Sequence, residues 1–217
     1  GIDRGSKELI KVEVPESWKT AEDEIVEKEI KTDRPEMKKF VKEILSPVDH
    51  QKGDAIPVST FVDMASGVFP AGSSAFEKRG IAVDVPEWDP TKCAQCNRCA
   101  MVCPHAVIRP VALTADELAA APANTKAVDL KVPKNSGLKY ALIVSTLDCT
   151  GCASCANVCP TKSLTMKPIA SQLDSQPVFD ALCDIDPKAE VASDKTVVSA
   201  QYLKPYLEFS GACAGCG

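Results

Sequence analysis

The clearest helical period of apolar residues lies between Pro35 and Pro47. The segment opens as helices often do, with Asp33 shortly before Pro35, and Pro47 is expected to end it. One face of the predicted helix gathers five apolar side chains, which are Met37, Phe40, Val41, Ile44 and Leu45. A helix with one apolar face stabilises itself by burying that face, so we expect this segment to pack against another element.

Two further segments carry helix signals. Thr114 and Glu117 have the spacing of a capping box, which predicts a short helix through about Ala121. A weaker apolar pattern predicts another helix over residues 178–183. Cys183 ends that pattern, and we expect it to be a small core residue rather than a reactive thiol.

Strands are expected in three places. Residues 7–14 alternate, with Ile10, Val12 and Val14 on one side. Residues 140–146 and 196–203 form apolar, strand-like runs. Residues 53–90 are rich in Gly, Pro and Ser and lack the Gly-Lys-Ser/Thr ending of a phosphate loop, so they predict an irregular connector.

Composition and charge narrow the possible functions. Hydrophobic residues make up 45% of the 217, yet no apolar run approaches the roughly 18 residues of a membrane span. The formal charge of −5 and the pI of about 5.2 give no basic footprint, so we expect no nucleic-acid partner. The chain opens on Gly1 without a Met or a secretory signal, which suggests an internal fragment of a longer protein.

Cysteine content changes this picture, because eight of the eleven cysteines fall into two tight groups. Small disulfide-rich proteins spread their cysteines along the chain, so this clustering favours metal ligation. Thiolates that must stay reduced indicate a reducing compartment, which is the cytoplasm. The two lone histidines, His50 and His105, have no second ligand nearby in the sequence and do not suggest catalysis.

The two groups are copies of one motif. An offset of 56 residues superposes all four cysteines of the first group on those of the second, which are Cys93, Cys96, Cys99 and Cys103 and then Cys149, Cys152, Cys155 and Cys159. The first copy ends in Cys-Ala-Met-Val-Cys-Pro and the second in Cys-Ala-Asn-Val-Cys-Pro. An internal duplication is the simplest explanation.

Each copy reads CxxCxxCxxxCP, which resembles the run of bacterial two-cluster ferredoxins, where the fourth cysteine ligates the other cluster. Three cysteines within seven residues can wrap one 4Fe-4S cubane. The proline after the fourth is expected to start a helix that aims its thiolate away from its own loop. The resemblance assigns Cys93, Cys96, Cys99 and Cys159 to cluster one and Cys149, Cys152, Cys155 and Cys103 to cluster two.

The alternative ligand set is zinc, because tetrahedral thiolate sites also use CxxC pairs. Zinc ribbons separate two such pairs by a longer loop, so three consecutive CxxC steps favour iron-sulfur. Five apolar residues near the motifs are expected to exclude water from the clusters, namely Trp88, Val102, Ile108, Val158 and Leu164. Four basic residues near them, Lys92, Arg98, Lys162 and Lys167, are more simply explained as solvated.

The end of the chain holds one more CxxC, formed by Cys213 and Cys216. Together with the double motif, with Phe69-Pro-Ala-Gly, with Phe76-Glu-Lys-Arg-Gly-Ile-Ala82 and with Val85-Pro-Glu-Trp88, it resembles pyruvate:ferredoxin (flavodoxin) oxidoreductase. The resemblance covers most residues from about 56 to 217. It implies that Cys213 and Cys216 are half of a third, proximal 4Fe-4S site, which two cysteines far downstream in that family complete.

The family resemblance also implies the activity and the partners. The parent enzyme would oxidise pyruvate with coenzyme A to acetyl-CoA and carbon dioxide, using thiamine diphosphate with magnesium. This segment would carry the electrons to a ferredoxin or flavodoxin, and it would have no decarboxylase activity alone. Further partners would be the remaining domains of the parent, assembled as a homodimer. The alternatives are an iron-sulfur carrier or subunit of another 2-oxoacid oxidoreductase complex, and a zinc-stabilised interaction module.

The predicted fold is α+β, a bacterial two-cluster ferredoxin-like domain with an insertion, preceded by a small α/β connector. Residues 1–34 would be the tail of a preceding domain and a linker, and residues 35–90 the connector. Residues 91–170 would form the cluster domain, with its insertion at 110–140. Residues 171–217 would connect to, and begin, the thiamine diphosphate domain.

Overall fold

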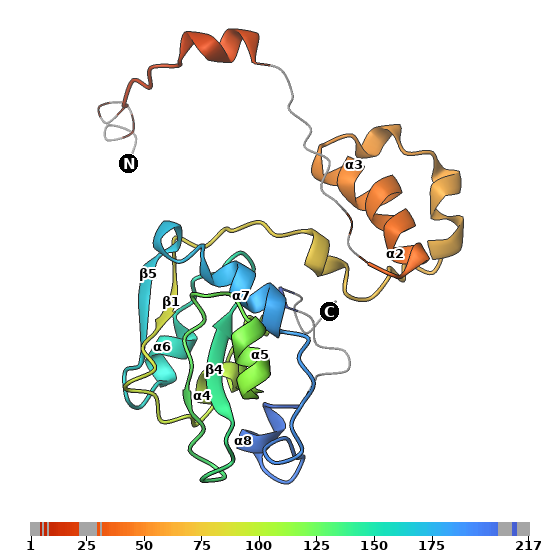
Figure 1. The fold of residues 1–217 in the computed structure, drawn as a ribbon. Coiled ribbons are helices and arrows are strands. Elements are labelled where there is room, and N and C mark those ends of the chain that lie inside the picture. Colours follow the sequence, from red (N-terminus) through yellow and green to blue (C-terminus); the bar gives the residue numbers. More distant parts are fainter. Residues whose placement is uncertain are drawn as a thin grey trace. The chain divides into compact units, whose positions relative to one another are not determined.

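The structure is a computed structural model, and it describes residues 5, 7, 9–21, 30, 32–203 and 210–211 (Figure 1). The chain divides into two compact units, Gly1–Thr60 and Phe61–Gly217. Each unit is described by itself. The second unit contains all the cysteines of the two motifs.

The first unit is helical in its described part. After η1 (Glu16–Thr20), the predicted helix is confirmed as α2 (Pro35–Phe40), and Met37 and Phe40 on its apolar face are buried. The strand predicted over residues 7–14 is wrong, because residues 9–14 are exposed and form no regular element. Alternation alone does not make a strand where no neighbouring strand pairs with it.

Pro47 does not end the helix, contrary to the sequence-based expectation. The chain continues from α2 through a π-helical turn, η2 (Val41–Leu45), into α3 (Ser46–Asp49). Proline removes one backbone donor from a helix, and a π-turn shifts the hydrogen-bond register, here with the Ser46 N–H donating to the Val41 carbonyl. The wider turn therefore accommodates Pro47 at the start of α3.

Short helical turns follow as far as residue 76. They are η3 (Gly53–Ala55), η4 (Val58–Met64), which crosses the boundary between the units, and η5 (Ser73–Phe76). The predicted α/β connector thus holds only helical elements up to residue 83 of the described chain. Its one strand, β1 (Asp84–Trp88), pairs within the second unit.

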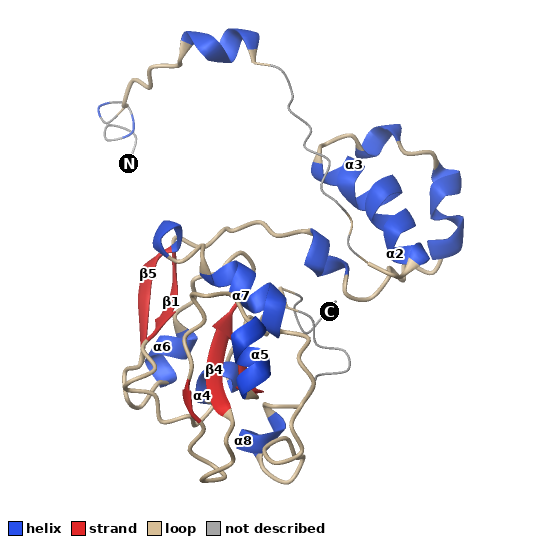
Figure 2. Cartoon of the chain, in the orientation of Figure 1, coloured by secondary structure: helices blue, strands red, loops and turns tan. Residues whose placement is uncertain are grey.

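Two copies of a strand–loop–helix–strand motif form the centre of the second unit (Figure 2). The first copy runs through β1, α4 (Arg98–Met101) and β2 (Ile108–Leu113). The second runs through β4 (Lys139–Val144), α6 (Ser154–Val158) and β5 (Leu164–Pro168), which confirms the strand predicted over 140–146. The duplication seen in the sequence is therefore a structural repeat.

The copies exchange strands. β1 pairs antiparallel with β5, and β2 pairs antiparallel with β4. The register keeps the repeat, since Trp88 lies opposite Leu164 in one pair and Ile108 lies opposite Val144 in the other, each shifted by 56 residues. Neither copy can complete a sheet without the other.

Additional elements cover the pair of β2 and β4. The capping box is confirmed, because Thr114 and Glu117 bond reciprocally at the start of α5 (Ala115–Ala120). β3 (Val128–Asp129) adds a third strand beside β4. The helix predicted over 178–183 corresponds to α7 (Ser175–Leu182), which follows η6 (Ile169–Ser171) and packs on β4.

The strand predicted over residues 196–203 is wrong. The segment forms a short helix, α8 (Val197–Ala200), because the Thr196 hydroxyl accepts a hydrogen bond from the Ser199 N–H and caps it. Val197 is 58% exposed, and no strand of the described sheets lies in this segment. In the described part of the chain, no helix is long and apolar enough to cross a membrane.

Two apolar cores hold the second unit. One surrounds the cysteine loops and includes Val85, Trp88 and Tyr140. The other lies between α7 and the sheet, where Phe179 and Leu182 pack on Leu113 and Ile143. Burying a side chain of that size contributes about 1.5–3 kcal/mol, so α7 clamps the sheet that supports the second loop.

Gly151, in the loop of the second motif, provides a test of how closely the copies approach. It has φ +73°, and a Cβ there would lie 3.0 Å from the Asp84 carbonyl oxygen of β1. We expect Gly151→Ala to lower the free energy of unfolding by about 2–3 kcal/mol, through backbone strain plus this contact. Anaerobic urea unfolding measures the loss.

The matched control is Gly137→Ala, since Gly137 has φ +75° with nothing within 4 Å of the added Cβ. It should lose only the strain contribution, about 1 kcal/mol. Equal losses for the two variants would contradict the close approach of the second loop to β1.

Candidate metal centre

All nine cysteines in the described part of the chain are free thiols. Eight of them belong to the two motifs, and each motif places its first three cysteines in a loop that ends in a short helix. The loops have the same backbone conformation, because positive φ angles recur 56 residues apart at Gln95 and Gly151, at Asn97 and Ala153, and at Ala106 and Lys162. The sequence therefore builds two nearly identical thiol-bearing loops.

Backbone N–H groups point at cysteine sulfurs in both copies. The Gln95 N–H donates to Cys93 Sγ and the Gly151 N–H to Cys149 Sγ, each at 3.4 Å. At the fourth cysteines, the Val107 N–H donates to Cys103 Sγ at 3.4 Å and the Ser163 N–H to Cys159 Sγ at 3.2 Å. Donors aimed at sulfur stabilise negative charge there, as thiolate ligands require.

The second loop gathers four thiols around one cavity. Cys149, Cys152 and Cys155 line it together with Cys103 from the first motif. Cys103 is also close enough to act electrostatically on Cys149 and Cys155. His105 lines the same cavity. The structure thus brings the fourth cysteine of one motif to the first three of the other.

The first loop gathers Cys93, Cys96 and Cys99, which interact electrostatically. Cys159 is tied to the start of this loop through Ser163, whose N–H donates to Cys159 Sγ and whose carbonyl accepts from the Asp89 N–H at 2.8 Å. The second motif has the same connection, since the Ser145 N–H donates to the Val107 carbonyl at 2.8 Å. The two centres are related by the repeat.

Cys99 and Cys155 occupy the same position in the two copies, and they are near enough to interact. The helices that carry them, α4 and α6, pack against each other. The two thiol-bearing loops therefore approach each other where α4 packs on α6.

Burial and hydrogen bonds shift the pKa values of several free thiols in opposite directions. Burial raises the pKa of Cys99 and of Cys155 to about 12, with neighbouring thiolates adding to the shift. Burial also opposes ionisation of Cys159, but hydrogen bonds from the Ser163 hydroxyl and N–H and from Thr161 lower its pKa to about 7. Metal ligation requires thiolates, so loading the buried positions would release protons.

The donor set fits a 4Fe-4S cubane, because it consists of thiols, four of them line one cavity, and N–H groups are directed at sulfur. Within the described ranges, no three His, Cys, Asp or Glu side chains lie close enough together to hold a single metal ion. A cubane spreads its ligands, since each thiolate binds a different iron. The assignment of each cysteine to a cluster stays a prediction.

The helix predicted to begin at the proline after each fourth cysteine is wrong. Pro104 and Pro160 lie in turns, and the short helices α4 and α6 precede the fourth cysteines. The residues at positive φ, Ala106 and Lys162, turn the chain directly into the next strand. Strand exchange, not a helix, carries Cys103 to the loop of the other copy.

Three of the residues predicted to exclude water are buried, with exposed fractions of 5% or less: Trp88, Ile108 and Leu164. Val102 is 37% exposed and does not serve this role. Sequence reasoning missed Tyr140, which is 1% exposed, donates to Asn97 Oδ1 at 3.1 Å and stacks edge-on with Trp88. Burial raises its pKa well above the usual value, with Cys93 and Cys99 contributing, so it packs beside the first loop.

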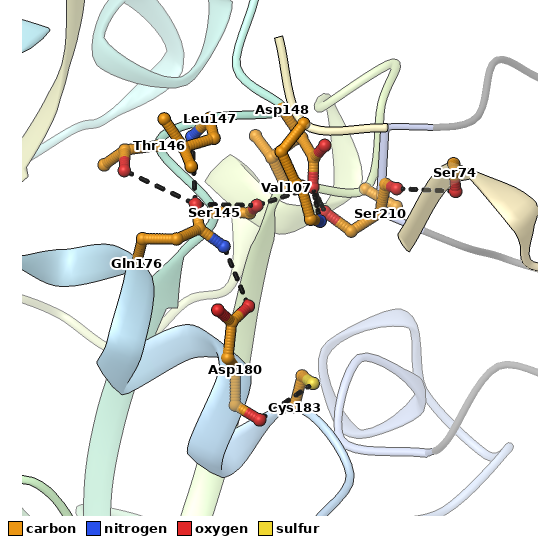
Figure 3. A network of polar contacts seen from close by, with 12 residues as sticks. Ser74, Val107, Ser145, Thr146, Leu147, Asp148, Gln176, Asp180, Cys183 and Ser210 are labelled. Carbon is orange, nitrogen blue, oxygen red and sulfur yellow. Dashed lines mark hydrogen bonds and ion pairs between the residues drawn. The ribbon is translucent and has the colours of Figure 1, made fainter. Parts of the chain in front are cut away.

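A polar network that the sequence did not reveal anchors the second loop (Figure 3). Asp148, directly before Cys149, accepts hydrogen bonds from the Ser145 hydroxyl at 2.6 Å and the Ser210 hydroxyl at 2.7 Å, and it pairs with Lys78. Its side chain is only 3% exposed. Three separate segments therefore meet at one buried carboxylate.

Gln176 extends this network into α7. Its Oε1 accepts from the Leu147 N–H at 2.9 Å, and its Nε2 donates to Asp180 Oδ1 at 2.8 Å (Figure 3). Cys183 lies at the end of α7, partly buried, and packs on the second core as expected. The network thus links the second loop to the helix that clamps the sheet.

Cys213 and Cys216 lie outside the described residues. Gly211, just before them, is described, and its N–H donates to the His105 carbonyl at 2.9 Å. His105 and Cys103 line one cavity. The chain therefore passes beside the second centre at residue 211.

Comparison with protein families defines the class. Two models of a 4Fe-4S binding domain match residues 85–108 and 142–165, one on each copy. A third model, the EKR domain, a domain of unknown function, matches residues 24–82. The chain therefore carries two 4Fe-4S ferredoxin domains downstream of an EKR domain.

Comparison with curated proteins shows which larger proteins contain a similar segment. The chain is homologous over its full length to a segment of the pyruvate-flavodoxin and pyruvate:ferredoxin oxidoreductases, being 43% identical to a pyruvate-flavodoxin oxidoreductase of Enterobacter agglomerans and to a pyruvate:ferredoxin oxidoreductase of Moorella thermoacetica. Both matches cover 100% of this chain and 18% of the relative. A pyruvate dehydrogenase [NADP(+)] of Cryptosporidium parvum is 40% identical, with 89% of this chain and 10% of the relative covered.

Lys78 should stabilise the second loop. Its side chain is 19% exposed, and removing it leaves the Asp148 carboxylate buried without its cation. We expect Lys78→Ala to lower the free energy of unfolding by about 3 kcal/mol in anaerobic urea unfolding. Arg79→Ala is the control, because Arg79 is 69% exposed in its pair with Glu77 and should cost less than about 1 kcal/mol. Similar losses would refute the role of the buried pair.

The predicted exchange of ligands is testable with paired variants. Replacing Cys93 and Cys96 by Ser should leave only cluster two, and replacing Cys149 and Cys152 should leave only cluster one, each with about four irons per chain. Adding Cys103→Ser should perturb the remaining centre in the first background and have no effect in the second. Iron analysis and electron paramagnetic resonance measure both.

Cys159→Ser is the matched control for this experiment. It should act in the opposite way, affecting the background that retains cluster one. The reverse pattern for both variants would mean that each loop keeps its own fourth cysteine.

Proposed function

We propose that this chain transfers electrons through two 4Fe-4S clusters inside a pyruvate:ferredoxin oxidoreductase. The observation that carries the proposal is the cavity where Cys103 joins Cys149, Cys152 and Cys155. A centre with ligands from both copies would join the two copies into one electron-transfer domain. In this proposal Cys93, Cys96, Cys99 and Cys159 hold cluster one, and Cys149, Cys152, Cys155 and Cys103 hold cluster two.

Electrons would enter from the thiamine site through a third, proximal 4Fe-4S cluster to which Cys213 and Cys216 contribute. Gly211 supports an order for the path, because it is bonded to His105 beside the second centre. Cluster two would therefore receive electrons first, and cluster one would follow across the packed helices α4 and α6, which carry Cys99 and Cys155.

When bound, a 4Fe-4S cluster supplies reversible one-electron transfer. The residues of this chain hold and insulate the two centres. Trp88 and Tyr140 exclude water beside the first loop, and Met166 lines the cavity of the second. N–H groups at Gln95 and Gly151 stabilise charge on the sulfurs, so the protein contributes the environment rather than the carbon chemistry.

Oxidation of pyruvate with coenzyme A, giving acetyl-CoA and carbon dioxide, would take place in the rest of the parent enzyme. The chain spans about 18% of the oxidoreductases that it matches. The external acceptor would be a ferredoxin or a flavodoxin, and the parent would be a homodimer. A reducing compartment such as the cytoplasm would keep the thiols available.

A second function, electron transfer in another 2-oxoacid oxidoreductase, uses the same residues. The similarity to a protein named pyruvate dehydrogenase [NADP(+)] favours considering it, since a related segment occurs there with a different named acceptor. Both functions rely on the same two clusters. They differ in the acceptor, which the chain's partners decide.

The proposal predicts the metal content and the redox behaviour of the chain. Anaerobically prepared protein should contain about eight irons and eight sulfides per chain, with a visible band that dithionite bleaches. It should not turn over pyruvate by itself. Stoichiometric zinc with no bleachable band would indicate the structural zinc alternative and overturn the proposal, and turnover of pyruvate would overturn the division of labour.

A further inference from the structure

The repeat provides an internal comparison between the two fourth cysteines. Both receive a backbone N–H from the residue four positions later, Val107 for Cys103 and Ser163 for Cys159. Both lie at the same point before an exchanged strand. Any difference in their surroundings must therefore come from side chains.

The side chains four positions after these cysteines differ in one polar group. Ser163 Oγ lies 3.3 Å from Cys159 Sγ, whereas Val107, 56 residues earlier, has no hydroxyl to offer Cys103. Ser163 is 3% exposed and Cys159 is 7% exposed, so water does not compete for this contact. Cys159 Sγ thus has a buried hydroxyl partner that Cys103 lacks.

The hydroxyl has a fixed role once iron is bound. A ligated cysteine has lost its proton, so Ser163 must be the donor and Cys159 Sγ the acceptor. Adding one electron to a cubane increases the negative charge on its ligands, and a donor aimed at the sulfur stabilises the reduced state more than the oxidised one. The effect is strongest where the site is dry.

We propose that Ser163 raises the reduction potential of the cluster bound by Cys159 and thereby creates an electronic difference between two centres that share one backbone frame. The inference rests on the proposed function, because it requires that the clusters be present. Ser163 contacts Cys159 Sγ rather than the cluster itself. It is therefore a positioning residue, which would act on the cluster through this sulfur. The electron comes from the upstream centre, or from a reductant such as dithionite in the test.

The hydroxyls of Thr161 and Ser154 also lie near ligand sulfurs but are less suited to this role. Thr161 Oγ1 is 3.7 Å from Cys159 Sγ, and Thr161 is exposed. Ser154 Oγ is 3.5 Å from Cys152 Sγ, and Cys152 is exposed, so water can replace it. Of these three residues, Ser163 is the buried one, so water cannot replace its hydroxyl.

Exchanging the two side chains tests the inference. In the iron-loaded 217-residue chain, Ser163→Val should make reduction of cluster one about tenfold less favourable, a shift of about 59 mV to more negative potential for a one-electron couple. Val107→Ser should shift cluster two in the positive direction. Each variant leaves the other centre as its control. Redox titrations followed by electron paramagnetic resonance measure both potentials.

Further variants separate this effect from loss of structure. Ser163→Thr keeps the hydroxyl and should keep the potential, while Ser163→Ala should behave as Ser163→Val does. Iron content should remain about eight per chain in all of them. If a Ser163 variant loses iron, Val107→Ser still decides the question through cluster two.

The outcomes distinguish this inference from the proposed function. Absence of any 4Fe-4S signal from the unsubstituted chain would overturn both. Full clusters with unchanged potentials in Ser163→Ala and in Val107→Ser would overturn this inference alone. A shift equal in both clusters would also overturn it, since the hydroxyl contacts one sulfur.

Discussion

The exchange of strands between the two copies is the constraint on which the second unit depends. β1 finds its only paired strand in β5, and β2 is paired with β4, so neither copy forms a sheet from its own strands within the described chain. The same exchange carries Cys103 to the cavity of the second loop. Sheet formation and assembly of the thiol groups are therefore one event, and a loss in either weakens both.

The buried thiols of the second unit are expected to ionise only when they bind a metal cluster. Burial holds the pKa of Cys99 and Cys155 at about 12, so without iron these thiols remain protonated among apolar neighbours. Burial also raises the pKa of Cys149, and the Gly151 N–H then faces a neutral sulfur, which accepts hydrogen bonds weakly. Binding of a cubane would turn the same geometry into charge-assisted contacts. Cluster binding is thus expected to contribute directly to folding stability.

Sequence reasoning predicted the elements that local chemistry decides. The offset of the cysteine motifs gave the repeat, the pattern from Met37 to Leu45 gave the helix, and Thr114 with Glu117 gave the cap of α5. It failed where a distant partner decides, as at residues 7–14 and 196–203, which have strand-like patterns but no strand to pair with. It also missed β1, because Val85-Pro-Glu-Trp88 becomes a strand only by pairing with β5.

For the candidate centre, too, the sequence predicted the features that local spacing decides and missed those that depend on distant partners. Spacing identified the eight cysteines, and the ferredoxin resemblance supplied the exchange of the fourth. Asp148 carried no signal, because its importance arises from Lys78 and Ser210, which are 70 residues before and 62 residues after it in the sequence. A buried carboxylate with partners on distant segments is visible only after folding.

Duplication also limits how the two centres can differ. The paired positive-φ residues and the paired N–H donors surround both cysteine loops with the same backbone groups. With these groups alone, the two clusters would have similar reduction potentials. Direction in a chain of redox centres needs a difference in energy between them. That difference must come from side chains that the repeat does not share, such as Tyr140 opposite Asp84 in the alignment and Ser163 opposite Val107. The shared backbone therefore fixes the positions of the two centres, and a few side chains that differ between the copies determine how favourably each centre accepts an electron.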